Sequence, residues 1–312
     1  MLNKFGFPTY KVLDFFEYSF GIVSLLSGLI SIWAFIEGKT DSLTIFTLLA
    51  ISAIFLAAFW KLLKFRQVAI NRLRGFSGAF HSFTDTIRDD YYNIMSLYIN
   101  GKLTSEQLTI MAEATCQVAV DIISTMLSES TGEKVYVSIK YFPRTAKAKS
   151  TKNIDVDDYV LATLCRSANS PQERHTHRLM RVGDNSGFQS IIKYQNNHFR
   201  AQDLDKYIKD TDDSGFGGFR TTNPNWRKFY RSFITVPIRI SRSLLPPPKG
   251  ASGGGYHIIG LLCADTISTS AFKGEDELNA YTNLLKSYAD ALYIYLERVD
   301  FYLGRLSAKK LF

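Results

Sequence analysis

The chain has 312 residues, of which 46% are hydrophobic, and its formal net charge is +8. With two long apolar segments set aside, the remaining length suffices for one globular domain and connecting helices. The three cysteines, Cys116, Cys165 and Cys263, are far apart and lie in apolar sequence. The odd number and wide spacing of these cysteines argue against a disulfide framework or a zinc site and predict reduced thiols in the core of a cytosolic domain.

Two apolar segments near the N-terminus predict a membrane hairpin. Residues 18–36 and 43–60 carry no formal charge, and each is close to the roughly 20 residues that cross a hydrocarbon core. The short polar linker EGKTDS predicts that the two helices run antiparallel. Residues 1–60 are therefore the predicted membrane region. The alternative is a buried helical hairpin of a soluble domain.

The charges that flank these segments predict the orientation. Lys4 and Lys11 precede the first segment, and the second is followed by a basic cluster of Lys61, Lys64, Arg66, Arg72 and Arg74. By the positive-inside rule, both termini are expected in the cytoplasm and the protein in the inner membrane as a multi-pass protein. The apolar run starts late and is followed by a second one, which argues against a cleavable signal peptide.

Small and hydroxyl residues recur at helical spacing within the two predicted spans. They are Gly21, Ser24, Gly28, Ser31, Thr44 and Thr47. One interpretation is close helix packing, which small residues permit. The other is that these residues line a pore made by several copies of the chain. Neither span contains an ionisable residue, so proton relays and charge-coupled transport are poorly supported.

We expect residues 61–103 to form a helical connector that is basic in its first part and aromatic in its second. Gly75 and Gly78 are the positions at which this helix could break. Four apolar positions keep a four, three, four spacing that is typical of a helix-to-helix seam. These positions are Ile87, Tyr91, Ile94 and Tyr98. Asn100 and Gly101 predict the end of the connector helix.

Residues 104–312 predict an α+β domain. A helix is expected over 104–129, with Thr104 or Ser105 as its N-cap and Gly132 near its end. Four β-rich runs follow, which predict an antiparallel sheet. They are residues 134–142, 159–168, 232–241 and 256–266. The Pro- and Gly-rich segment 242–255 predicts an exposed hairpin loop.

A long C-terminal helix is expected from about Glu275. Its apolar positions alternate by three and four over about four heptads, which is typical of a coiled coil or bundle. The stripe predicts oligomerisation through Leu285, Tyr288, Leu292, Tyr295, Val299 and Tyr302. Alternatively, its N-terminal half covers the sheet.

Three segments resemble the GAF domain, a small-molecule sensor fold. NPNWRKFYRSFITVPIRI (223–240) resembles the strand ending in Val-Pro-Ile, and YHIIGLLCADTISTSAF (256–272) resembles the following strand, with Gly260 and Asp265 at commonly used positions. GDNSGFQSII (183–192) resembles the short helix over the pocket. The resemblance implies a six-stranded sheet with helices on one face and a ligand pocket on the other. Members bind nucleotides, tetrapyrroles or other small molecules, rarely catalyse, and are usually paired through their terminal helices; no tetrapyrrole is expected here.

Residues 166–231 interleave basic and aromatic side chains. Guanidinium groups match phosphate geometry and aromatic rings stack on bases, so the mixture predicts a nucleotide or short oligonucleotide ligand. The candidate ligand-binding residues are Arg166, Arg178, Arg181, Tyr194, Arg220, Trp226, Arg227, Lys228 and Arg231. The alternative is a solvated basic face that pairs with the acidic run 203–213.

Other chemistry has weaker support in the sequence. His175 and His177 have a spacing that suits one strand face, but no third histidine or cysteine is near them, so no metal site is expected. GFGGFR (215–220) lacks the ending of a phosphate-binding loop. No nucleophile motif or paired carboxylates stand out, so neither enzymatic activity nor a cofactor is predicted.

These features together predict a membrane effector. In layout, with two spans and one sensor domain, the chain is similar to the membrane effectors of bacterial anti-phage systems that answer nucleotide messengers. We expect a homo-oligomer in the lipid bilayer that opens a pore when a nucleotide, made by an upstream synthase, binds the sensor. The alternative is a membrane-anchored sensor or scaffold that signals to a separate cytosolic partner.

Overall fold

The computed structural model describes residues 22, 26, 28–30, 32, 33, 35–38, 42–142, 155–174, 179–213, 219–241, 256–272 and 274–309. The chain divides into two units, Met1–Gly75 and Phe76–Phe312. The division falls inside the predicted connector 61–103, because the second half of that segment packs with the sheet-containing unit.

The first unit is helical and apolar at its surface. The described residues between 22 and 36 are helical, and Gly38 follows with a φ of 59°. Helix α2 (Ser42–Ile99) begins four residues later. Large apolar side chains are exposed along both stretches, namely Ile22, Leu26, Leu29, Ile30, Ile32, Trp33, Phe35, Ile36, Ile51, Ile54, Leu56 and Trp60.

The predicted membrane hairpin stays a prediction. By length and composition, one helix in the described part of the chain could cross a membrane, α3 (Ser105–Thr131), and half of its apolar window is buried inside the protein. Of the small residues in the predicted spans, Gly21, Ser24 and Ser31 lie outside the described residues. A Cβ placed on Gly28 would meet nothing within 4 Å among the residues that the structure describes. Thr44 and Thr47 both lie in α2, where Thr47 is exposed.

Helix α2 runs without interruption through Gly75 and Gly78, so neither glycine is the break that the sequence indicated. Glycine in a helix interior costs about 1 kcal/mol relative to alanine but does not by itself end a helix. The helix ends at Ile99, as expected, and Gly101 follows with a φ of 66°.

Helix α3 has caps at both ends, as the sequence predicts. Thr104 Oγ1 accepts a hydrogen bond from the Gln107 backbone N–H at 3.1 Å, and the Gln107 side chain accepts one from the Thr104 N–H at 2.9 Å. This reciprocal pair is a capping box. At the other end, Gly132 adopts the left-handed conformation that commonly ends helices.

Replacing Thr104 by alanine removes the capping hydroxyl, and we expect a loss of about 1 kcal/mol in the free energy of unfolding. Denaturant titration of the purified chain measures this loss. Thr104→Ser keeps the oxygen and should cost less than half as much. Equal losses in the two variants would mean that the capping bond does not stabilise α3.

The second unit is built on a six-stranded antiparallel sheet with strand order β3-β2-β1-β6-β5-β4. Its strands are β1 (Tyr136–Tyr141), β2 (Val160–Arg166), β3 (Met180–Arg181), β4 (Phe199–Ala201), β5 (Ser232–Ser241) and β6 (Tyr256–Thr266). The four predicted strands and the α+β class are confirmed, whereas β3 and β4 were not predicted. The predicted loop 242–255 lies outside the described residues.

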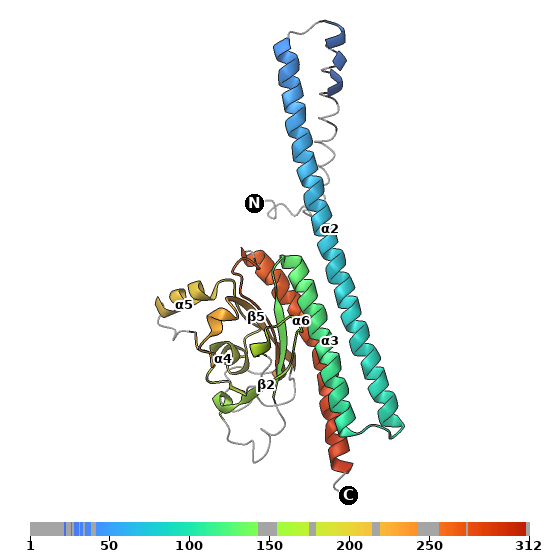
Figure 1. The fold of residues 1–312 in the computed structure, drawn as a ribbon, viewed down its shortest axis with the longest axis vertical. Helices are drawn as coiled ribbons and strands as arrows, with labels where there is room; N and C mark the ends of the chain where they lie inside the picture. The colour runs from blue at the N-terminus through green and yellow to red at the C-terminus, as the bar shows by residue number, and fades with distance from the viewer. Residues whose placement is uncertain are drawn as a thin grey trace. The chain divides into compact units, whose positions relative to one another are not determined.

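The remaining elements are helices. They are η4 (Val156–Asp158), η5 (Gln172–Arg174), α4 (Ser186–Ile192), α5 (Leu204–Asp213), η6 (Trp226–Lys228) and α6 (Gly274–Lys309). Figure 1 shows α3 and α6 side by side on one face of the sheet and α4 and α5 on its other side. Helix α4 lies in the segment that resembles the short helix over a GAF pocket, and α5 was not predicted.

The main core lies between the sheet and the long helices. Side chains alternate between the two faces of a strand, so Val137, Ile139 and Leu262 point toward α3 and α6. Cys116 and Cys165 belong to the same core, and all three cysteines are free and buried, as predicted.

The predicted oligomerisation stripe of α6 is buried within the chain. Leu285, Tyr288, Leu292, Tyr295, Val299 and Tyr302 are all 7% exposed or less. The Tyr288 ring lies 4.7 Å from that of Phe83, and the Tyr302 ring lies 4.6 Å from that of Tyr98. The helical seam predicted for residues 87–98 therefore packs against α6 of the same chain. The stripe is not free to pair with a second copy, which corrects the expectation from the sequence.

Candidate functional site

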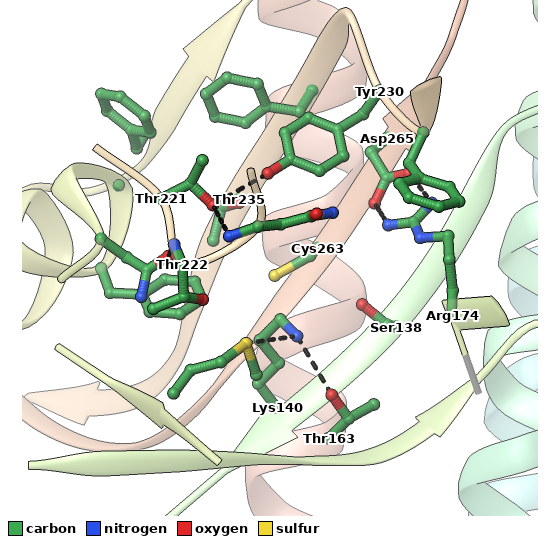
Figure 2. Close-up of a pocket in the computed structure, with 18 of the residues that line it drawn as sticks. Ser138, Lys140, Thr163, Arg174, Thr221, Thr222, Tyr230, Thr235, Cys263 and Asp265 are labelled. Carbon is green, nitrogen blue, oxygen red and sulfur yellow. Dashed lines mark hydrogen bonds and ion pairs between the residues drawn. The ribbon is translucent and has the colours of Figure 1, made fainter. Parts of the chain in front are cut away.

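A cavity of about 220 Å³ lies on the face of the sheet opposite α3 and α6. Its floor is formed by strands β1, β2, β5 and β6, and its walls include the start of α4 and the segment 219–223. Figure 2 shows Ser138, Lys140 and Cys263 pointing from the sheet into the same space. The GAF resemblance implies a pocket on this face, and the structure has one.

A register shift in the sheet places two polar residues of β2 in the cavity. Lys140 pairs with Thr163, and Ser138 pairs with Arg166, so the register shifts by one residue between Ile139 and Lys140. In a regular strand, residues three apart point to opposite faces. Because of this irregularity, both Thr163 and Arg166 line the cavity.

Lys140 is a buried cation at the cavity floor. The residue is 6% exposed, and its Nζ donates hydrogen bonds to Thr163 Oγ1 at 3.2 Å and to Met180 Sδ at 3.6 Å. Nζ lies 5.9 Å from the centre of the Phe188 ring. Among the residues that the structure describes, no carboxylate forms an ion pair with it. Burial, and then the nearby Arg166 charge, lower the pKa of Lys140 to about 7.

Two neighbours of Lys140 have hydrogen-bonding groups without partners. Ser138 is 1% exposed, and its Oγ makes no hydrogen bond within the described ranges. The Arg166 Nε is likewise buried and unpaired there. Burial, and then the charge of Arg174, lower the pKa of Arg166. Unsatisfied buried polar groups are costly, so they call for an explanation.

Arg174 and Asp265 form a buried ion pair at the side of the cavity. Arg174 Nη1 and Nη2 donate to Asp265 Oδ1 and Oδ2 at 2.5 and 2.8 Å, and the two side chains are 8% and 10% exposed. The rings of Tyr136, Phe229 and Tyr230 lie 5.7–5.8 Å from the guanidinium carbon. Burial has the largest single effect and lowers the pKa of Arg174, but the charge and hydrogen bonds of Asp265 and the nearby tyrosines together outweigh it, so the pKa is raised.

Aromatic rings form much of the remaining cavity wall. They belong to Phe188, Phe199, Phe219, Phe229, Tyr230 and Phe233. The Tyr230 hydroxyl is 3.1 Å from the Thr221 hydroxyl (Figure 2). The wall is tightly packed at Gly187, where an added Cβ would come within 2.7 Å of the Phe199 ring. The cavity thus combines cations at its floor with flat apolar surfaces around it.

Two of the predicted ligand-binding residues, Arg166 and Arg220, line the cavity. Arg220 Nη2 donates to Gln189 Oε1 at 2.9 Å. Arg181 instead pairs with Asp158 at the surface, and Arg227 and Arg231 pair with Asp205. Trp226 is buried in the core beside the cavity, Tyr194 and Lys228 are exposed, and Arg178 lies outside the described residues. Arg227 and Arg231 therefore follow the alternative interpretation, in which basic surface residues pair with the acidic run 203–213.

The sequence did not single out Lys140 or Ser138, and Arg174 was only one of the many basic residues of segment 166–231. Lys140, inside the β-rich run KVYVSIKYF, was the available signal, because a charged residue at a buried strand position needs a reason. Asp265 was noted only for its resemblance to a common GAF position. Its partner Arg174 is 91 residues away in sequence, and only the fold brings the two together.

Metal binding finds no support among the described residues, where no group of three or more His, Cys, Asp or Glu side chains is suitably placed. His175, His177 and the glycines of GFGGFR lie outside those residues.

No family model and no curated protein sequence matches this chain. Among solved structures, it is similar to the GAF domain of an Acinetobacter phosphoenolpyruvate-protein phosphotransferase, with 12% identity over 69% of this chain and 93% of that one and a TM-score of 0.35. It is also similar to the GAF domain of the Coxiella burnetii phosphoenolpyruvate-protein phosphotransferase, with 11% identity over 70% of this chain and 95% of that one and a TM-score of 0.37. A third similar structure is a GAF domain/HD domain protein from Geobacter sulfurreducens, with 14% identity over 57% of this chain and 90% of that one and a TM-score of 0.34.

Proposed function

We propose that this protein is a ligand-gated membrane effector whose GAF-like domain binds a nucleotide-type molecule. The observation that carries the proposal is the cavity with a cationic floor and aromatic walls. Cations attract phosphate, and aromatic rings stack on bases. A volume of about 220 Å³ is below the range of about 300–1,000 Å³ typical of small-molecule pockets. It favours one small ligand over an oligonucleotide. The domain binds its ligand without catalysing a reaction.

The proposed output is a change in membrane permeability. The segments 18–36 and 43–60 carry no formal charge and are long enough to span a bilayer. Many of the apolar side chains that the structure describes in these segments are exposed. Ligand binding opens the assembly only if the open state binds the ligand more tightly than the closed state. A role in anti-phage defence, with an upstream messenger synthase, follows from the layout of the chain alone.

Reconstitution in liposomes tests this function. With an ion gradient across the membrane, the full chain should dissipate the gradient when a nucleotide from a panel of mono- and dinucleotides is added. Ser24→Leu and Ser31→Leu should change the flux, because both positions lie in the predicted first span. Ser77→Leu, at an exposed position of α2 outside the predicted spans, is the matched control. A gradient that persists with every nucleotide would reject the effector function.

A second candidate is a membrane-anchored sensor that signals to a separate cytosolic partner. The observation that favours it is the burial of the α6 stripe within the chain, which removes the expected seam between copies. Native mass spectrometry separates the two candidates. A discrete homo-oligomer that carries a phosphorylated ligand favours the effector, and a ligand-bound monomer favours the anchored sensor.

A further inference from the structure

The floor of the cavity has an excess of positive charge that no ion pair among the described residues neutralises. The charged and titratable groups around Lys140 are Arg166 on β2, Glu173 and Arg174 in η5, Arg220, Tyr230, and Cys263 and Asp265 on β6. Asp265 is engaged by Arg174 through both of its oxygens. Lys140 and Arg166 are therefore left without an ion-pair partner among the described residues.

Hydrogen-bond donors without partners occur on the same part of the floor. Ser138 and Lys140 lie two apart on β1 and so point to the same face, and Arg166 is the cross-strand partner of Ser138. The Ser138 hydroxyl and the Arg166 Nε–H have no acceptor within the described chain. The register shift between Ile139 and Lys140 then places Thr163 opposite Lys140, on the same face of the sheet as Arg166.

We propose that Ser138, Lys140 and Arg166 form a subsite for a compact oxyanion, the phosphate group of the ligand. The subsite rests on the proposed sensory function of the cavity and specifies which end of the ligand lies at the sheet. An ammonium, a guanidinium N–H and a hydroxyl together supply charge and three donors, which suits a tetrahedral oxyanion. The base or other flat part of the ligand then faces the aromatic wall.

Binding at this subsite takes up a proton. The amine of Lys140 must be protonated to attract an oxyanion, and burial beside Arg166 favours its neutral form when the cavity is empty. Above about pH 7, affinity should therefore fall by up to about tenfold per pH unit. Burial raises the pKa of Tyr230 and of Cys263, so both side chains stay neutral in this range.

The test uses sulfate and inorganic phosphate as probes of the full chain, because sulfate remains a dianion throughout the pH range. Calorimetric titration near pH 6.5 should show saturable binding of both ions, and Lys140→Met should raise the dissociation constants at least about tenfold. Ser138→Ala, a smaller change that is easily accommodated, should raise them a few-fold. Lys228→Met makes the same substitution on the surface and should change neither constant. The sulfate affinity of the wild-type protein should weaken with pH, and that of Lys140→Met should not.

Absence of saturable binding at tens of millimolar sulfate and phosphate would overturn the subsite, as would equal affinity in wild type and Lys140→Met. The liposome assay fails or succeeds independently of this result. Nucleotide-gated flux that is unchanged in Lys140→Met would remove the subsite and retain the sensor. Oxyanion binding without any gated flux would retain the subsite and remove the membrane effector.

Discussion

Replacing Asp265 by asparagine should lower the free energy of unfolding by about 3–5 kcal/mol. The carboxylate balances the buried charge of Arg174, which it contacts through two hydrogen bonds. An amide keeps the shape but removes the charge, so Arg174 would remain buried beside the cations Arg166 and Lys140. Denaturant titration of the full chain, followed by circular dichroism, measures the loss.

The matched control is Asp158→Asn. Asp158 pairs with Arg181 at the surface, and the two side chains are 55% and 56% exposed. Exposed ion pairs contribute about 0–1 kcal/mol, because water screens both charges. A loss at Asp265 no larger than the loss at Asp158 would show that the buried pair does not hold the cavity wall together.

A double variant separates the value of the ion pair from the cost of an uncompensated charge. Arg174→Met with Asp265→Leu removes both charges and keeps apolar volume at the site. Replacing a whole buried ion pair is often close to neutral, whereas removing one partner is not. The double variant should therefore be more stable than Asp265→Asn alone. The reverse order would mean that the pair itself, rather than charge balance, stabilises the domain.

The sequence predicted the elements that have a clear repeat. Helix α3 was predicted with both its caps and α6 with its start, because their apolar positions follow helical spacing. Strands β1, β2, β5 and β6 were predicted because they are β-rich and six to eleven residues long. Strands β3 and β4 have two and three residues, which is too short for an alternation to be visible. Helix α5 is an acidic run that was interpreted as a charged surface.

The sequence could not predict which distant segments of the chain contact each other. The α6 stripe predicted a helical partner, but its spacing does not say whether that partner is a second copy or α2 and α3 of the same chain. The basic residues of 166–231 were treated as one set, although only Arg166 and Arg220 line the cavity. Whether an arginine is free or paired depends on neighbours such as Asp205, and the fold determines those neighbours.

Lys140 violates the usual preference of charged residues for the surface, and such violations are expected at functional sites. Its pKa is lowered from 10.5 to about 7, chiefly by burial. The unfolded chain therefore binds more protons than the folded chain between about pH 7 and pH 10.5, so the stability contributed at this site rises with pH across that window and is constant below it. Lowering the pKa of Lys140 from 10.5 to about 7 corresponds to a free energy of at most about 5 kcal/mol.

Lys140→Met should accordingly be more stable than the wild type at pH 7, by about 3–4 kcal/mol, and the difference should shrink toward zero near about pH 10. Unfolding of both proteins in denaturant across this pH range measures the difference. Lys228→Met should remain within about 0.5 kcal/mol of the wild type at every pH, because Lys228 is exposed. A Lys140→Met protein that is less stable than the wild type at pH 7 would mean that the ammonium is well compensated in the empty cavity. The gain in stability that we expect instead means that the empty cavity holds an unfavourable charge, which a bound oxyanion would relieve.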